Sequence, residues 1–240
     1  MGKGVANVGQ DRWVRRLYLP AYGVGEAAML AQTHPRTVSR WFYGYRTPSG
    51  ARADRVLGDR ERRVALSYLQ LVEVAFVATL RRIGVTLQRL RIAHEYLAHR
   101  FGAPEYPFAQ LKLKTDGAHV LKDLETESSW VNSLLVASAH GQIVWADPIE
   151  ERIRQFDYDL ERGLAIRWYP RGPDAPVVVD PQIAFGAPIL RDDGIPTGVI
   201  RGRYQAGEDP GEIGEDFGIR PEAVRYALEF EGVQFVAAMV

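Results

Sequence analysis

The stretch that decides the fold is residues 22–45, YGVGEAAMLAQTHPRTVSRWFYGY. Its first half has apolar residues at i, i+3, i+4 and i+7, the spacing of one helix face: Val24, Ala27, Ala28 and Ala31. Pro35 then stands where a second helix begins, because its fixed φ suits the first helical position. The second half repeats the apolar spacing at Val38, Trp41, Phe42 and Tyr45. The stretch therefore predicts two short helices joined by a tight turn.

The outer face of the second helix carries two arginines one turn apart, two small hydroxyl residues and a tyrosine: Arg36, Thr37, Ser39, Arg40 and Tyr43. This composition is that of a helix-turn-helix reader of DNA. Its arginines can contact guanine edges or phosphates, and its hydroxyls can orient on the backbone. Two positions differ from the usual pattern, since Gln32 replaces a left-handed Gly and His34 replaces a Ser, Thr, Asp or Asn N-cap. The alternative is a solvated helix hairpin within a larger helical core.

The overall composition is that of a soluble globular protein. The 240 residues are 46% hydrophobic and 25% charged, which allows one large or two small domains. The absence of cysteine excludes disulfides and thiolate zinc sites. No apolar run approaches the roughly 18 residues of a membrane span, and the N-terminus lacks the apolar region of a signal peptide. We expect a cytoplasmic protein without a membrane partner.

Charge is distributed unevenly although the formal net charge is zero. Residues 1–105 hold 17 Lys and Arg against 8 Asp and Glu, whereas residues 106–240 hold 13 against 22. A basic half and an acidic half indicate two partners of opposite charge. The alternative is that the two halves face each other across a dimer or domain contact.

Basic segments flank the predicted helix pair. Residues 1–21 are expected to form a mobile basic arm, with Arg12, Arg15 and Arg16 around Trp13 and Leu17. Residues 46–64 are rich in arginine and poor in apolar residues, which predicts an exposed wing or loop near phosphates. Arg46, at the start of this segment, completes the set of expected DNA contacts.

Two longer helices are predicted next. Ser67 and Gln70 form a capping box, an apolar row follows it, and Gly84 ends the first helix in a left-handed conformation. Thr86 caps the second helix, whose apolar residues step 3, 4, 3, 4 as in a heptad seam: Leu87, Leu90, His94, Leu97 and Phe101. These helices are expected to pack on each other and on a second copy, and a homodimer would match a palindromic operator. Residues 22–105 form the predicted DNA-binding and dimerisation domain.

The middle segment, residues 106–179, is expected to contain a small antiparallel sheet. Residues 108–124 alternate apolar and polar around Thr115-Asp116-Gly117, a hairpin signal. Further strands are predicted in residues 130–137, 142–146, 164–169 and 177–179. A helix is expected from Pro148 to Gln155, with an extension to Leu160 left open.

Residues 180–240 are expected to form a trihelical domain of helix-turn-helix type. Thr197 precedes the first helix, Asp209-Pro210-Gly211-Glu212 is a capping box that opens the second, and Pro221 opens the third. The third helix exposes acidic residues that would repel phosphate, so a protein contact or a structural role is favoured over DNA reading. The predicted fold is therefore mainly α with a small antiparallel β element.

With these residues in view, the chain resembles a known family. YGVGEAAMLAQTHPRTVSRW, followed by residues 66–97, is similar to the N-terminal domain of the larger, two-domain VapB-like antitoxins, which distantly resemble MerR regulators. The C-terminal stretch resembles a widespread small antitoxin-like domain through four marks: Asp180-Pro181, Gly186-x-Pro188, Ile195-Pro196-Thr197 and Ala206-Gly207. With DYDLERGLAIRWYPRG between them, the resemblance covers nearly the whole chain after residue 20.

The resemblance implies a bacterial type II toxin–antitoxin pair. The antitoxin would bind and silence a PIN-domain ribonuclease toxin, and its N-terminal domain would repress the shared operon. The family pattern of the second helix falls on Arg36, Thr37, Ser39 and Arg40. Such toxins keep carboxylates for Mg²⁺, which a partner arginine can neutralise by bidentate pairing. Arg201 and Arg203 are the candidates for that contact.

The principal alternative is a MerR-like transcriptional regulator that responds to a ligand, held in an apolar pocket around Trp130, Trp145 or Trp168. A dinucleotide site at Gly23–Ala28 is disfavoured because no acid follows at the required spacing. His94 and His99 diverge by about 140° on one helix, so they do not make a zinc motif. Acids at the start of a solvated helix explain Asp147, Glu150 and Glu151. We find no catalytic set, and we expect no enzyme activity, cofactor or metal.

Overall fold

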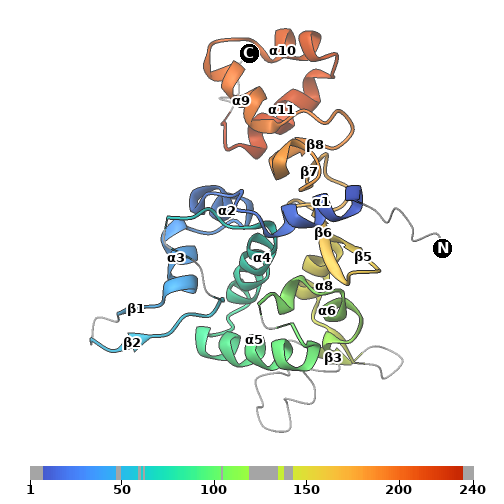
Figure 1. Cartoon of the computed structure of the whole chain (residues 1–240). Helices are drawn as coiled ribbons and strands as arrows, with labels where there is room; N and C mark the ends of the chain where they lie inside the picture. Colours follow the sequence, from blue (N-terminus) through green and yellow to red (C-terminus); the bar gives the residue numbers. More distant parts are fainter. Residues whose placement is uncertain are drawn as a thin grey trace, which may run out of the picture. The chain divides into compact units, whose positions relative to one another are not determined.

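The computed structural model describes residues 8–46, 50–58, 61, 63–103, 105–118, 135–137 and 143–234 (Figure 1). The chain divides into two compact units, residues up to Ile166 (unit 1) and residues from Arg167 (unit 2). Helices dominate, and the strands form small antiparallel sheets, so the predicted fold class is confirmed. Within the described residues, no helix is long and apolar enough to cross a membrane, and no group of three His, Asp or Glu is placed to hold a metal.

Unit 1 is built around α4 (Tyr68–Arg82). All of its residues from Tyr68 to Leu80 except Gln70 are buried, which is the pattern of a central core helix. The predicted Ser67–Gln70 capping box is present, with both reciprocal hydrogen bonds. Phe76 stacks on Phe108 and on Phe156, at centroid distances of 5.8 and 5.4 Å. The neighbours of α4 include α1, α2, α5 and α8 (Figure 1).

The expected mobility of residues 1–21 is wrong for the part that the structure describes. Val8–Tyr18 form α1, which packs against α4. Leu17 is fully buried, and the Arg162 guanidinium covers the Trp13 ring at 5.3 Å. Trp13 and Leu17 are four residues apart and share a helix face, so the segment gains apolar burial by folding.

The second long helix, α5 (Leu87–Phe101), begins and ends as predicted. Thr86 caps its first turn, and Gly102 closes it at φ 66°. Four predicted seam residues are buried against unit 1: Leu90, His94, Leu97 and Phe101. The seam is thus used within one chain, and the homodimer stays a prediction.

The hairpin predicted around Thr115-Asp116-Gly117 is wrong. Pro107–Ala109 form the 3-10 helix η1 and Leu111–Thr115 form α6. The reason is a contact distant in sequence, because the buried Glu73 carboxylate accepts the Phe108 and Ala109 N–H groups. The second half of the expected hairpin, residues 119–124, lies outside the described residues.

The other expectations for the middle segment are mostly confirmed. β3 (Leu135–Ala137) and β4 (Ile143–Trp145) pair antiparallel, with Val136 opposite Val144. The predicted helix is α8 (Asp147–Arg154), but its possible extension to Leu160 is wrong because β5 (Phe156–Asp159) follows directly. The buried Phe156 at the start of β5 stacks on Phe76 and so favours the strand. The boundary between the two units falls within β6 (Leu164–Trp168).

Unit 2 combines a small sheet with three helices. Trp168 pairs with Val179 of β7 (Val177–Val179), and β7 pairs antiparallel with β8 (Pro188–Leu190). The predicted helices are present as α9 (Thr197–Gln205), α10 (Pro210–Phe217) and α11 (Pro221–Phe230). The Asp209–Glu212 capping box is confirmed. The helices bury Ile200, Ile213, Val224, Ala227 and Leu228. The sequence did not predict β8, because the region from Asp180 was assigned to helix.

Candidate nucleic-acid interface

The candidate site is built on α2 (Val24–Leu30) and α3 (Pro35–Tyr43), the two helices predicted from residues 22–45. Most of the expected apolar residues are buried: Ala27, Ala28 and Ala31 on the first face, and Val38, Trp41 and Phe42 on the second. Val24 and Tyr45 are only half-buried, and Leu30, which was not predicted, is buried with the first face. Because this face of α3 is fixed in the core, its opposite face is left to solvent.

The turn between the helices uses a side chain where a glycine is usual. Gln32 has a φ of 53°, the left-handed conformation that the sequence predicted for this position. The left-handed conformation costs a non-glycine residue about 1–2 kcal/mol of conformational free energy. The Gln32 Oε1 accepts a hydrogen bond from Arg82 Nη1 of α4 at 3.0 Å. The Thr33 N–H donates to the Ala28 carbonyl at 2.8 Å, so the turn is held from both sides.

His34 serves as the N-cap of α3. Its Nδ1 accepts the Arg36 N–H at 3.1 Å, which satisfies one of the free donors of the first helical turn. The imidazole nitrogen therefore caps the helix as a Ser or Asp side-chain oxygen does in most N-caps.

The exposed face of α3 carries most of the predicted contact residues. Arg36 and Arg40 are exposed, whereas Thr37, Ser39 and Tyr43 are half-buried. At 100° per residue, the positions of the arginines, Ser39 and Tyr43 span an arc of about 100°, and Thr37 lies about 60° outside that arc. The Arg40 guanidinium lies over the Tyr45 ring at 4.9 Å, and the Tyr43 hydroxyl donates to the Glu61 carbonyl at 3.3 Å.

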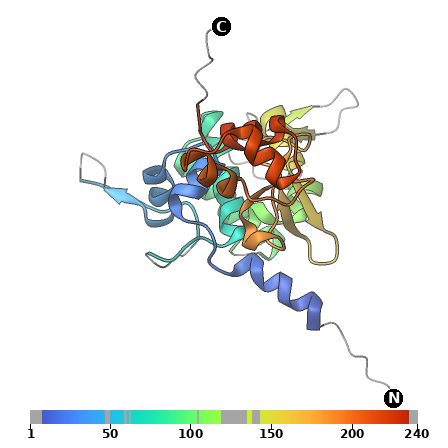
Figure 2. The same cartoon turned by 90° about the horizontal axis from the view of Figure 1, so that it is seen from above.

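A two-stranded wing follows α3 directly. β1 (Tyr45–Arg46) pairs antiparallel with β2 (Arg52–Ala53), and both views show this wing projecting away from the helices of unit 1 (Figures 1 and 2). Arg46 and Arg52 are both exposed and stand directly opposite each other. Like charges opposed across two strands repel, so a bound anion would stabilise the pair.

The charge of this face is not neutralised within the part of the chain that the structure describes. No described Asp or Glu forms an ion pair with Arg36, Arg40, Arg46 or Arg52. Sequence reasoning did not single out Arg52, although the arginine content of residues 46–64 indicated such a residue. It also missed Glu73, whose only signal was an acid inside an otherwise apolar helix.

Gly44 joins α3 to the wing and is predicted to tolerate no side chain. Its φ is 68° and its ψ −172°, a conformation open essentially to glycine. A Cβ at this position would lie 2.3 Å from the Ala53 carbonyl oxygen. We expect Gly44→Ala to break the β1–β2 pairing and to expose residues 45–53 to limited proteolysis. Gly23→Ala is the matched control, because a Cβ there meets no atom within 4 Å; equal protease resistance of both variants would contradict the prediction.

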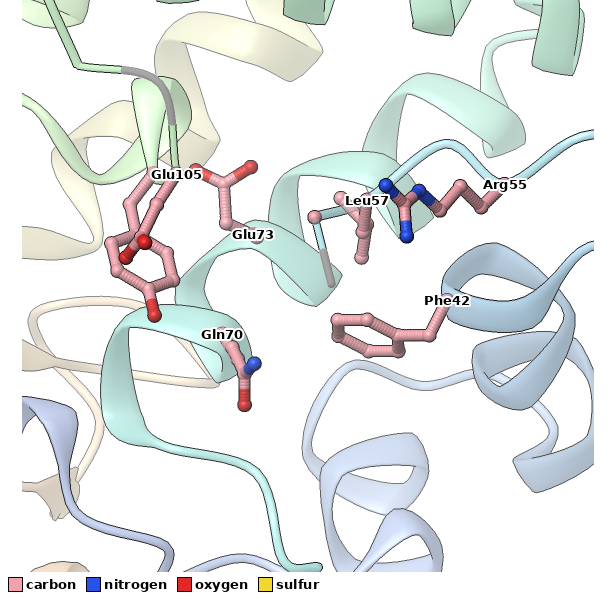
Figure 3. A pocket seen from close by; sticks show the side chains of 8 residues that line it. Phe42, Arg55, Leu57, Gln70, Glu73 and Glu105 are labelled. Atoms are coloured by element: carbon pink, nitrogen blue, oxygen red, sulfur yellow. The ribbon is translucent and has the colours of Figure 1, made fainter. Parts of the chain in front are cut away.

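A cavity of about 270 Å³ lies in unit 1 beside α3. Phe42 of α3 lines it together with Arg55, Leu57, Gly58, Gln70, Glu73, Glu105 and Tyr106 (Figure 3). Burial raises the pKa of the Tyr106 hydroxyl, and the neighbouring Glu105 carboxylate raises it further. The lining is mixed polar and apolar, unlike the apolar tryptophan pocket of the alternative hypothesis. Trp168 is fully buried in unit 2, Trp130 lies outside the described residues, and only the backbone of Trp145 is described.

The two arginines predicted to meet a toxin are both engaged within unit 2. Arg201 Nη1 lies 2.8 Å from Glu231 Oε2, and the Glu231 side chain is 6% exposed. Arg203 pairs with Glu208 and with Asp216, and its guanidinium covers the Phe217 ring at 5.1 Å. A carboxylate of another protein would have to displace these partners.

Comparisons with known proteins agree with the antitoxin resemblance at a coarse level. Residues 177–230 match the family model described as "Protein of unknown function (DUF433)". The chain is 26% identical over 231 residues to a Mycobacterium tuberculosis protein named "Putative antitoxin VapB45", covering 89% of this chain and 95% of that protein. The crystal structure of Rv2018 from the same organism superposes with a TM-score of 0.70 at 26% identity. That likeness covers 89% of this chain and 99% of the solved one.

Proposed function

We propose that this protein is the antitoxin of a bacterial type II toxin–antitoxin system, which represses its own operon and neutralises a PIN-domain ribonuclease. The DNA-binding part of the proposal rests on the exposed face of α3 and on the wing. Their four arginines meet no carboxylate among the described residues. The likeness to a protein named as an antitoxin supports the other half.

In this proposal α3 enters the major groove as the second helix of a helix-turn-helix unit. Arg36 and Arg40 lie one turn apart on its exposed face and reach guanine O6 and N7 or neighbouring phosphates. Ser39, Thr37 and Tyr43 orient the helix on the sugar–phosphate backbone. A homodimer would place two such helices on a palindromic operator.

The wing would contact phosphates rather than bases. Opposed Arg46 and Arg52 carry two positive charges on a ribbon that projects from unit 1. Each phosphate neutralised releases condensed counterions, so affinity depends on salt. We expect Arg46→Ala and Arg52→Ala each to make the negative slope of log K against log [salt] shallower by about 1, with sequence preference unchanged. A fluorescence-anisotropy salt titration measures the slope, and wild-type slopes in both variants would remove the wing from the interface.

The toxin half of the proposal assigns Arg201 and Arg203 to the ribonuclease surface. Because both are held in ion pairs, binding would exchange Glu231, Glu208 or Asp216 for a toxin carboxylate. The exchange keeps each guanidinium paired. It leaves the displaced carboxylate without its partner, which costs most at Glu231, whose side chain is 6% exposed.

The experiment that tests the proposed function is co-expression with the ribonuclease encoded by the neighbouring reading frame. The ribonuclease, produced alone in the cytoplasm of the host cell, is expected to arrest growth. Co-expression of this chain should restore growth, and the two proteins should purify as one complex. Failure of both rescue and complex formation would end the antitoxin proposal.

A ligand-responsive regulator is the second candidate, favoured by the cavity beside α3. A molecule in it would contact Phe42, on the inner face of the proposed reading helix. Gly58 lines the cavity, and a Cβ there meets only the Glu105 carbonyl at an ordinary 3.7 Å. If the cavity communicates with α3, filling it by Gly58→Leu should change operator affinity several-fold, about 1 kcal/mol. Unchanged affinity in a mobility shift would count against this candidate.

A further inference from the structure

A polar side chain lies in the last part of α4, among the apolar residues of the core of unit 1. Thr79 is 5% exposed, and its hydroxyl uses its full capacity of one donated and two accepted hydrogen bonds. It donates to the Ala75 carbonyl at 3.1 Å. It accepts Arg152 Nε of α8 at 2.7 Å and Arg82 Nη2 of α4 at 3.3 Å. One buried oxygen therefore joins arginines from two different helices.

The two arginines connect this oxygen to two other parts of unit 1. Arg152 is 6% exposed, and its Nη1 donates to Gln155 Oε1 at 2.5 Å, at the end of α8. Arg82 Nη1 donates to Gln32 Oε1 at 3.0 Å, in the turn between α2 and α3. The connected side chains (the Thr79 cluster) are Gln32, Thr79, Arg82, Arg152 and Gln155. The cluster thus links the end of α8 to the turn that precedes the proposed reading helix.

Gln32 is the residue through which the cluster acts on α3. Its φ of 53° is a strained conformation for a residue with a Cβ. A strained backbone persists only where its surroundings over-determine it, and the bond from Arg82 supplies such a constraint from α4. Pro35 opens α3 three positions later. A relaxed turn would therefore change the direction in which α3 leaves it.

We propose that Arg82 and Thr79 are positioning residues for DNA reading, which hold the strained turn in place and tie it to α8. The inference rests on the proposed function and adds the regulation of the same site. The two states are a held turn and a relaxed turn, and operator binding favours the held one. Because α8 shares the Thr79 hydroxyl with Arg82, a displacement of α8 changes the operator affinity of α3.

Arg82→Ala removes the bonds to Gln32 and to the Thr79 hydroxyl. With the purified full chain and the promoter fragment of its own operon, we expect Kd to rise about three- to tenfold. Arg81→Ala is the matched control, because Arg81 is the neighbouring exposed arginine and donates to the Val85 carbonyl instead. Its Kd should stay within about twofold of wild type, and an equal loss in both variants would overturn the inference.

The salt dependence separates positioning from a direct phosphate contact. A positioning residue neutralises no phosphate, so Arg82→Ala should keep the wild-type slope of log K against log [salt]. Fluorescence-anisotropy titrations at several salt concentrations measure this slope. A negative slope that becomes shallower by about 1 would make Arg82 a phosphate contact and would overturn its positioning role.

The decisive measurement is made in a chain with glycine at position 32. Glycine adopts a φ of 53° without strain, so the turn no longer needs Arg82. In the Gln32→Gly chain, Arg82→Ala should change Kd by less than about twofold. The same fold-loss in both backgrounds would contradict the inference. Loss of all operator binding by Gln32→Gly itself would contradict it too, since relief of strain would then not replace the bond.

Thr79→Val and Thr79→Ser test the link to α8. Valine keeps the volume of the side chain but removes the shared oxygen, so we expect Kd to rise about three- to tenfold. Serine keeps the hydroxyl and should retain most of the affinity. Wild-type affinity in the valine variant would remove Thr79 from the pathway. Equal losses with valine and serine would attribute the effect to packing instead of the hydrogen bonds.

The wild-type chain separates this inference from the proposal beneath it. If it binds its promoter fragment and Arg82→Ala binds equally well, the positioning role is overturned and the DNA-binding proposal stands. If it does not bind the fragment, the proposed DNA-binding function fails and the positioning role with it.

Discussion

Replacement of Arg36 or Arg40 by alanine is expected to weaken operator binding by about 1–3 kcal/mol for each residue. Both guanidiniums are exposed on one face of α3, and neither is paired with a carboxylate among the described residues. Arg40 is also oriented by the Tyr45 ring, which lowers the entropy that it loses on binding. A residue that reads a base should additionally relax the sequence preference at that position. Mobility-shift titrations at one fixed salt concentration measure both effects.

Arg220→Ala is the matched control for these variants. Arg220 is an exposed arginine at the N-terminus of α11 in unit 2, so its removal changes net charge by the same amount. We expect operator affinity within about 0.5 kcal/mol of wild type for this control. Equal losses in all three variants would indicate a general charge effect, and wild-type binding by the α3 variants would exclude Arg36 and Arg40 as readers.

Glu73→Ala is expected to have the largest effect on stability, about 3–5 kcal/mol. The Glu73 side chain is 2% exposed, and its Oε2 lies 3.0 Å from His94 Nε2. Its Oε1 accepts the Phe108 and Ala109 N–H groups at 2.7 and 3.2 Å. Alanine would leave two backbone donors and a ring nitrogen buried without their partner, and would separate α4 from α5 and η1. Urea unfolding followed by circular dichroism measures the change.

Glu73→Gln separates the hydrogen bonds from the charge. The amide oxygen can still accept the two N–H groups, so we expect a cost below about 1 kcal/mol at neutral pH. Burial raises the pKa of Glu73 above its ordinary value of 4.5, although the bond from His94 opposes the shift. An acid with a raised pKa contributes stability that is complete below the unfolded-state pKa and is lost as pH rises through the folded-state pKa. Relative to the glutamine variant, wild type should therefore lose stability as pH rises above about 4.5; the opposite slope would contradict this account.

Local signals explain which elements the sequence predicted correctly. The caps at Ser67, Thr86 and Asp209 involve partners within three residues, so the helices that they begin are readable from the chain. The Thr115-Asp116-Gly117 hairpin failed because a turn signal of this kind fits a helix end as well as a hairpin. The hydrogen bond from the Phe108 N–H to Glu73, which lies 35 residues away in the sequence, favours the helix over the hairpin.

In the candidate site too, features set by local sequence were predicted and features set by distant contacts were not. The apolar spacing of α3 was enough to place Arg36 and Arg40 on its exposed face. The opposition of Arg46 to Arg52 depends on strand register, which charge content does not encode. The bond from Arg82 to Gln32 was equally hidden, since it joins residues 50 positions apart in the sequence.

The most direct test of the DNA-binding claim is the specificity of the purified full chain for the promoter of its own operon. Competition mobility shifts should compare that fragment with an unrelated fragment of equal length at about 150 mM salt. We predict that the promoter binds at least about 10³-fold more tightly. Equal affinity for the two fragments, or no binding to either, would contradict the account.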